Sequence, residues 1–137
     1  MTIKESRVKA IDYLRIQLNS IKESVNTIYN FLESKEYKNN IYFKMNFCDI
    51  TGFISSTWGT IVSFKIIDLF KDTFLYKHID KFDNTFLKLR LEYGNINLEN
   101  ISTTELKKLF DDTLEIVNNT LNTSKMQVFK IYNIFDL

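Results

Sequence analysis

The sequence predicts an all-α fold, and three observations support this prediction. The chain of 137 residues contains no proline and only three glycines, whereas a domain rich in tight turns uses more of both. Apolar residues recur at helical spacing along most of the chain. A serine-led capping pattern precedes the last long apolar period. Together they predict one domain over residues 1–137, a bundle of about four to six helices.

The segment from about Lys4 to Ser34 is expected to form one long N-terminal amphipathic helix. Its apolar residues follow each other at alternating intervals of three and four: Ile11, Leu14, Leu18, Ile21, Val25, Ile28 and Leu32. This spacing is typical of a helix that packs nearly parallel to a neighbour. A self-associating coiled coil is the alternative interpretation.

A second helix is expected from about Ile41 to Lys71. Apolar residues cover most of its faces, among them Phe53, Trp58, Ile61, Val62, Phe64, Ile66, Ile67, Leu69 and Phe70. A helix that is apolar nearly all round belongs at the centre of a bundle, so we expect it to be buried, with Trp58 in the core. Gly52 and Gly59 predict a kink or a close helix contact. Cys48, which lies among apolar residues, is expected to be a small buried hydrophobe.

The second half of the chain is expected to contain further helices. Residues 86–93 alternate between apolar and charged side chains, which predicts a helix end or an extended segment. Ser102 and Glu105 form a capping box that opens a helix reaching about Leu121. The apolar tail, Met126 to Leu137, is expected to be a last helix packed on the bundle, or an exposed docking segment.

Composition excludes several classes of function. The 18 basic and 17 acidic residues give a net charge of +1, which argues against a strongly basic nucleic-acid clamp but allows a local basic patch. One cysteine and one histidine argue against a disulfide and against a zinc site. No motif for a phosphate loop, a metal or a nucleophile elbow is present, so we expect no metal and no cofactor. Without a signal peptide or a spanning segment, a cytoplasmic protein that does not enter membranes is expected.

The span from Phe70 to Asp80 is the strongest candidate for chemistry. His78 can exchange a proton near neutral pH, and Lys71 and Lys77 can attract a phosphate. Tyr76 and the imidazole can stack on a base. These groups would suit metal-free cleavage of RNA, in which a ribose 2′-hydroxyl attacks the adjacent phosphate. The alternative is that His78 is an ordinary, partly exposed helix residue.

The sequence Lys71-Asp-Thr-Phe-Leu-Tyr-Lys-His78-Ile-Asp80 resembles the motif of the HEPN superfamily, in which an arginine precedes a histidine by a few residues. The surroundings are similar to abortive-infection members of that family. They have a long first helix, a Leu-Phe-Asp-like stretch (compare Asp68 to Asp72), and a Ser-initiated helix after the motif (compare Ser102 to Asn118). The resemblance covers about residues 5–121. Lys71 stands nearest to the position of the arginine, and Lys77 replaces a small residue.

The resemblance implies a helical bundle that forms a homodimer, with two copies of the motif in one cleft. Family members are often ribonucleases of toxin–antitoxin or phage-defence systems. By this resemblance His78 would be catalytic, with Lys71 nearest to the place of the arginine and Asp80 as the trailing acid. Tyr76, Lys77 and Asp80 are expected to contact RNA. Lysine lacks the bidentate fork with which arginine grips phosphate. Two interpretations therefore stay open: the protein is an active metal-independent endoribonuclease, or it is an inactive relative. In either case its partner would be RNA, an antitoxin or another protein.

A second span, Ser56 to Phe64, resembles the Trp-Gly helix start of viral Bcl-type apoptosis inhibitors. In that family an arginine after the glycine contacts a partner helix, and Thr60 stands at its position here. The alternative function that this implies is a non-enzymatic helical interaction module. Such a module would bind a partner protein through an apolar groove.

Overall fold

A computed structural model describes residues 1–132 of the chain, and these residues form four long α-helices. The α-helices are α1 (Ile3–Tyr29), α2 (Ile41–Ile66), α3 (Tyr76–Gly94) and α4 (Thr103–Tyr132), with two short 3₁₀ helices, η1 (Asn30–Glu33) and η2 (Tyr37–Asn39), between α1 and α2. This part of the chain contains no strand, which confirms the all-α prediction. None of its helices has both the length and the apolar character needed to cross a membrane.

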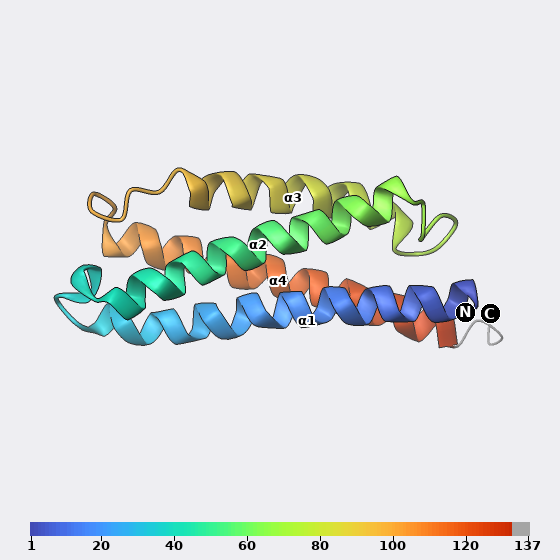
Figure 1. Ribbon diagram of the computed structural model, residues 1–137, viewed down its shortest axis with the longest axis horizontal. Coiled ribbons are helices and arrows are strands. Elements are labelled where there is room, and N and C mark those ends of the chain that lie inside the picture. Colours follow the sequence, from blue (N-terminus) through green and yellow to red (C-terminus); the bar gives the residue numbers. More distant parts are fainter. Residues whose placement is uncertain (133–137) are drawn as a thin grey trace.

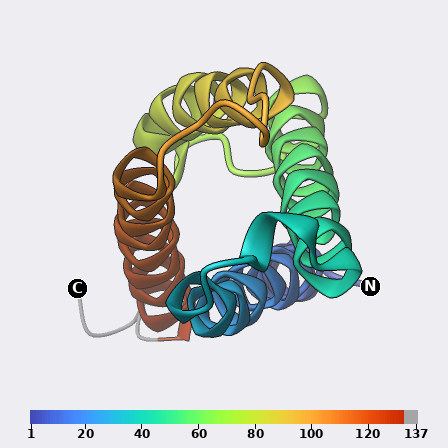
Figure 2. The same ribbon diagram turned by 90° about the vertical axis from the view of Figure 1, so that its left-hand side faces the viewer.

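The four helices form an up-and-down bundle. Consecutive helices run in opposite directions (Figure 1), and a view along the bundle shows each of them beside its neighbours in sequence (Figure 2). α1 packs against α2 and α4, and α2 packs against α3, whereas the contact between α3 and α4 is much less extensive. The seam between α3 and α4 lies on the side of the ring opposite the face formed by α1 and α2.

The core contains one apolar stripe from each helix. The predicted stripe of α1 is buried along its whole length. α2 contributes Phe43, Phe47, Ile50, Ile54, Ile61 and Phe64, and α3 contributes Ile79, Phe82, Phe86, Leu89 and Tyr93. The spacing of these α3 residues is helical, so residues 86–93 are part of a helix and the alternating pattern does not form an extended segment.

The expectation that α2 is buried on all sides is wrong. A ring of four helices has no central member, and α2 leaves a row of large apolar side chains exposed: Ile41, Tyr42, Met45, Phe53 and Ile66. Cys48 lies on the same outer side and is also exposed, which contradicts its predicted burial. Trp58 is partly buried and packs against the core, as the sequence predicted.

Two helix boundaries differ from those expected. α2 ends at Ile66 instead of Lys71, and Asp68 and Asp72 in the segment that follows have positive φ angles of 51° and 63°, which a helix does not adopt. α4 continues through the polar run that was expected to end it. Hydroxyl groups there, such as Ser124 Oγ to Thr120 O, donate to carbonyls one turn back, so these hydroxyls are satisfied within the helix.

The start of α4 is capped as predicted. The hydroxyl of Ser102 accepts a hydrogen bond from the Glu105 amide at 3.1 Å. A second contact, 2.6 Å between the hydroxyls of Tyr37 and Thr103, ties the α1–α2 connection to this end of α4. The α4 N-terminus is therefore anchored both locally and by tertiary contact.

The connection between α2 and α3 is held from both sides, which fixes where α3 begins. Arg7 of α1 donates to the carbonyls of Leu69 (2.7 Å) and Lys71 (3.1 Å). On the other side, the buried Gln127 of α4 accepts a hydrogen bond from the amide of Leu75 at 2.7 Å. Since Leu75 directly precedes α3, these bonds set the position of the first turn of α3.

Replacing Gln127 by leucine is expected to destabilise the fold by about 1–3 kcal/mol, because the buried amide of Leu75 would lose its acceptor. Urea denaturation followed by circular dichroism measures the change. Met126→Leu alters the exposed neighbouring residue and should change stability by less than about 0.5 kcal/mol. Equal stability of wild type and Gln127→Leu would show that the Gln127–Leu75 bond does not anchor the connection.

Candidate functional site

The loose packing of α3 on α4 leaves a groove along their seam. One stretch of the groove has a volume of about 370 Å³ and is lined by His78, Lys81, Phe82 and Thr85 of α3 and by Ile116, Asn119, Thr120, Asn122 and Thr123 of α4. Short amide and hydroxyl side chains on α4 stand there at helical spacing, where larger apolar residues would close the seam. The groove therefore follows from the polar composition of this part of α4.

His78 is held in the groove by two aromatic rings. Phe82 stands one helical turn after His78 on the same face of α3, and Phe74 reaches the imidazole from the connection that precedes the helix. The ring centroids of Phe74 and His78 are 4.8 Å apart, and those of His78 and Phe82 are 6.1 Å apart with nearly parallel planes. The imidazole is half-buried, so it is fixed in orientation while part of it faces solvent.

The groove is positively charged at this end. Lys77 and Lys130 place their ammonium groups 5.8 Å and 5.2 Å from the centre of the Phe74 ring, and Lys81 lines the groove itself. No aspartate or glutamate is among the lining residues, and α4 has no acidic residue from Ile116 to its end at Tyr132. The arrangement can attract an anion to a site with a planar ring and several amides.

The next stretch of the seam has the opposite charge. It has a volume of about 360 Å³, and Glu92, Asp112 and Glu115 line it with a single lysine, Lys88. A hydrogen bond of 2.7 Å between the buried hydroxyls of Tyr93 and Thr113 joins the two helices near that end. An anionic ligand would therefore be confined to the His78 end.

The structure does not bring all the predicted site residues to this groove. Lys77 and His78 flank Phe74, but Tyr76 and Asp80 line a separate hollow of about 130 Å³ between α2 and α3. Lys71 lies in the α2–α3 connection, where its carbonyl accepts from Arg7. The separation is geometric, because residues 78 and 80 are about 200° apart around a helix.

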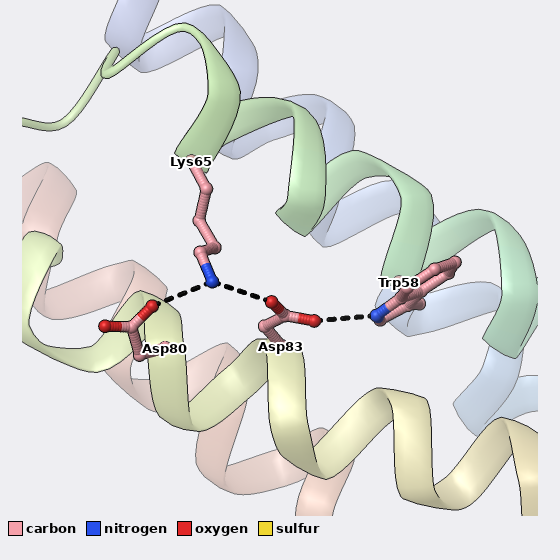
Figure 3. A network of polar contacts seen from close by, with 4 residues as sticks. All are labelled: Trp58, Lys65, Asp80 and Asp83. Carbon is pink, nitrogen blue, oxygen red and sulfur yellow. Dashed lines mark hydrogen bonds and ion pairs between the residues drawn. The ribbon is translucent and has the colours of Figure 1, made fainter.

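Asp80 takes part in the packing of α2 on α3 (Figure 3). The ammonium of Lys65 lies 2.9 Å from carboxylate oxygens of both Asp80 and Asp83. Trp58 donates to the other oxygen of Asp83 at 2.8 Å, and the guanidinium of Arg90 lies 5.0 Å from the Trp58 ring centre. The hydrogen bond from Lys65 lowers the pKa of Asp83 below its usual value, burial opposes this shift, and Trp58 reinforces it.

Several groove residues escaped the sequence analysis. Lys81, Asn119 and Asn122 line the groove but were not predicted to belong with His78. Phe74 lies in the connection before α3, four residues before the histidine. Phe82 could have been found, since it stands one helical turn after His78. The groove residues of α4 could not have been found from the sequence, because their proximity to His78 depends on how α3 and α4 pack against each other. In the described residues, no group of three or more His, Cys, Asp or Glu side chains could hold a metal ion.

Replacing Asp83 by asparagine should lower stability by about 1 kcal/mol at pH 7, because a charge-assisted hydrogen bond is lost. The pKa of Asp83 is lowered in the folded state. The stabilisation of the fold by its carboxylate is therefore complete above the unfolded-state pKa of about 3.9 and is lost as the pH falls through the folded-state pKa. The stabilities of wild type and Asp83→Asn in urea denaturation should therefore converge as the pH falls below about 3.9. Asp80→Asn is the matched control, since the Asp80 side chain is 82% exposed. Equal losses of stability for both variants, or a loss for Asp83→Asn that does not vary with pH, would contradict the stabilising role of the Asp83 carboxylate.

A scan against protein-family models found no matching family, and searches of curated proteins and of solved structures found no match to the chain either. The function is therefore inferred from the chemistry of the groove itself.

Proposed function

We propose that the protein binds single-stranded RNA in the groove between α3 and α4 without cleaving it. The observation that supports this proposal is the His78 imidazole, which is held between two aromatic rings in a groove lined by lysine, amides and hydroxyls and by no carboxylate. The HEPN-like relationship, the cytoplasmic location and a role in microbial defence or a toxin–antitoxin system belong to the same proposal. The relationship and the role in defence are supported by the resemblance of Lys71 to Asp80, and the location is supported by the single cysteine, which suits a reducing compartment.

Each feature of the groove suits one part of a nucleotide. Aromatic and imidazole faces stack on bases, and such stacking contributes about 1–3 kcal/mol per base. Lys81 in the groove lining and Lys130 over the Phe74 ring attract phosphates without reading sequence. The amides of Asn119 and Asn122 can both donate to and accept from base edges. A volume of about 370 Å³ lies at the small end of ligand pockets, which favours an unstacked base over a duplex.

Binding without cleavage is favoured because a ribonuclease needs more groups than the groove contains. Metal-free cleavage uses a base, an acid and a cation that grips the phosphate. His78 can take only one of the two proton-transfer roles at a time. Lys71 and Asp80, which the resemblance would add, lie outside the groove lining. The inactive relative is therefore the better interpretation for a single copy of the chain.

The second candidate function is binding of a protein partner, such as an antitoxin or an amphipathic helix of the kind that Bcl-type proteins bind. The observation that favours it is the row of exposed apolar residues on α2, which includes Tyr42, Met45 and Phe53. No residue of α2 lines the groove between α3 and α4. The two candidate functions can therefore be tested with separate variants.

The RNA proposal predicts that Lys81→Glu and Asn122→Asp each weaken binding of a fluorescein-labelled 12-nucleotide RNA at least tenfold, because each places a carboxylate in the groove. Fluorescence anisotropy at 50 mM and 200 mM salt measures the dissociation constant. Lys107→Glu, which makes the same charge change at an exposed position on the other end of α4, is the matched control and should weaken binding less than threefold. Equal weakening by Lys107→Glu would show general charge attraction instead of a site.

Incubation of the same RNA with wild type in EDTA tests the absence of cleavage. We expect intact RNA with both wild type and His78→Ala. Cleavage by wild type that His78→Ala abolishes would overturn the non-cleaving interpretation and restore the nuclease. A lack of RNA binding by wild type at 50 mM salt would exclude the RNA proposal and favour the protein partner.

A further inference from the structure

The face formed by α1 and α2 carries large apolar side chains that the fold leaves exposed. Tyr42 and Ile66 of α2 are 68% and 77% exposed, and Tyr13 and Ile16 of α1 are 59% and 66% exposed. Single exposed apolar residues are ordinary, but a group of them on one face marks an interaction surface.

The register of the two helices places these residues near one another. The amide of Asn46 donates to the carbonyl of Ser24 at 2.7 Å, which sets the antiparallel alignment of α1 and α2. Tyr13 precedes Ser24 by three helical turns, and Phe53 follows Asn46 by two turns, so each stands on the edge of its helix that faces the other. Tyr13 and Phe53 therefore lie within about one turn of the same level, next to the α1–α2 boundary.

The outermost stripe of α2 has large residues at both ends and small residues in the middle. In order along the helix it contains Ile41, Met45, Cys48, Gly52, Ser56, Gly59, Ser63 and Ile66. A Cβ atom added at Gly52 or Gly59 would meet no heavy atom within 4 Å apart from those of its chain neighbours and the surrounding helix backbone. The monomer therefore does not need either glycine for packing, although glycine inside a helix is unfavourable relative to alanine.

We propose that this face binds the same face of a second copy of the chain, with the two α2 helices antiparallel and the two-fold axis near Ser55 and Ser56. Two crossing helices are closest at their centre and diverge toward their ends. The small central residues permit close approach, and Met45 and Ile66 at the ends fill the diverging space. Antiparallel pairing places Gly52 opposite Gly59 and Met45 opposite Ile66, so one surface is complementary to itself.

Charge favours the antiparallel arrangement over a parallel one. Asp49 is exposed on α2, and Lys9 is exposed on α1. With the axis near Ser55, Asp49 of one copy lies level with residue 62 of α2 in the other copy. Lys9 of that other copy lies at nearly the same level on its α1. Opposite charges therefore face each other across the interface. A parallel pair would place the two Asp49 carboxylates at one level, where they would repel.

The face is large enough for a stable dimer. The 26 residues of α2 extend about 39 Å, and two helices side by side are about 20 Å wide. The resulting area of about 800 Å² per copy is that of a standard specific interface.

This dimer differs from the shared cleft that the HEPN resemblance implies. Because the α3–α4 seam is opposite the α1–α2 face (Figure 2), the two His78 grooves would point away from each other. The dimer does not depend on RNA binding, so either proposal can fail without the other.

Disulfide cross-linking tests the antiparallel pairing, because Cys48 is the only cysteine and is exposed. Antiparallel pairing places Cys48 opposite Ser63 of the other copy, whereas the two Cys48 residues are about 22 Å apart, far beyond the reach of about 7 Å between Cα atoms. Mild oxidation should therefore convert Ser63→Cys to a covalent dimer on a non-reducing gel. Wild type and the control Cys48→Ser/Ser63→Cys should stay monomeric on the gel. A monomeric Ser63→Cys, or cross-linking of wild type, would overturn the pairing.

Analytical ultracentrifugation tests the dimer without any added cysteine. Wild type should sediment as a dimer at micromolar concentration, and Gly52→Leu should raise the dissociation constant at least tenfold while the thermal midpoint of the monomer stays equal or rises. Asn84→Leu, which places leucine at an exposed position on α3, is the matched control and should leave the dimer intact. Wild type that is monomeric at 100 µM would overturn the proposal, as would dimers of Gly52→Leu with unchanged affinity.

Discussion

Each of the four helices buries one apolar stripe, and the rest of the structure depends on this constraint. Four such stripes can meet in a ring, where every helix keeps an outer face and touches two neighbours. A ring also contains four seams, which need not be equally tight. In this protein the seams α1–α2, α2–α3 and α1–α4 are extensive, and the seam α3–α4 is not. The groove and the exposed α2 face are both consequences of this geometry.

The helices could be predicted to the extent that their apolar stripes are visible in local sequence. The stripe of α1 is regular from Ile11 to Ile28, and all of it is buried. The spacing in α2 was ambiguous because apolar residues cover most of its faces, and no local pattern shows whether such a residue meets the core or a surface. Cys48 was misplaced for this reason. The continuation of α4 past Ser124 was missed because hydroxyl-to-carbonyl bonds within a helix are not visible in a propensity pattern.

The candidate site could be predicted only in part, for a related reason. The histidine stood out because it is the only one in the chain, and its neighbour Lys77 does lie beside it. Tyr76 and Asp80 are close to His78 in sequence, but a helix turns by about 100° per residue, so they project elsewhere. Lys71 lies in the connection before α3, where its carbonyl accepts from Arg7. The groove residues from α4 are more than 35 positions away in sequence, and their place beside His78 is set by tertiary packing alone.

Polar contacts couple α3 to α2 more firmly than to α4 at the His78 end. Lys65 and Trp58 of α2 converge on Asp83, and Arg90 donates to Ser55 at 3.2 Å. These bonds lie on one side of α3, and His78 and Lys81 lie on the other. A ligand that enters the α3–α4 seam would therefore displace none of the contacts that hold α3 on α2. The same division explains how one small bundle can support a polar groove on one face and an apolar surface on the opposite face.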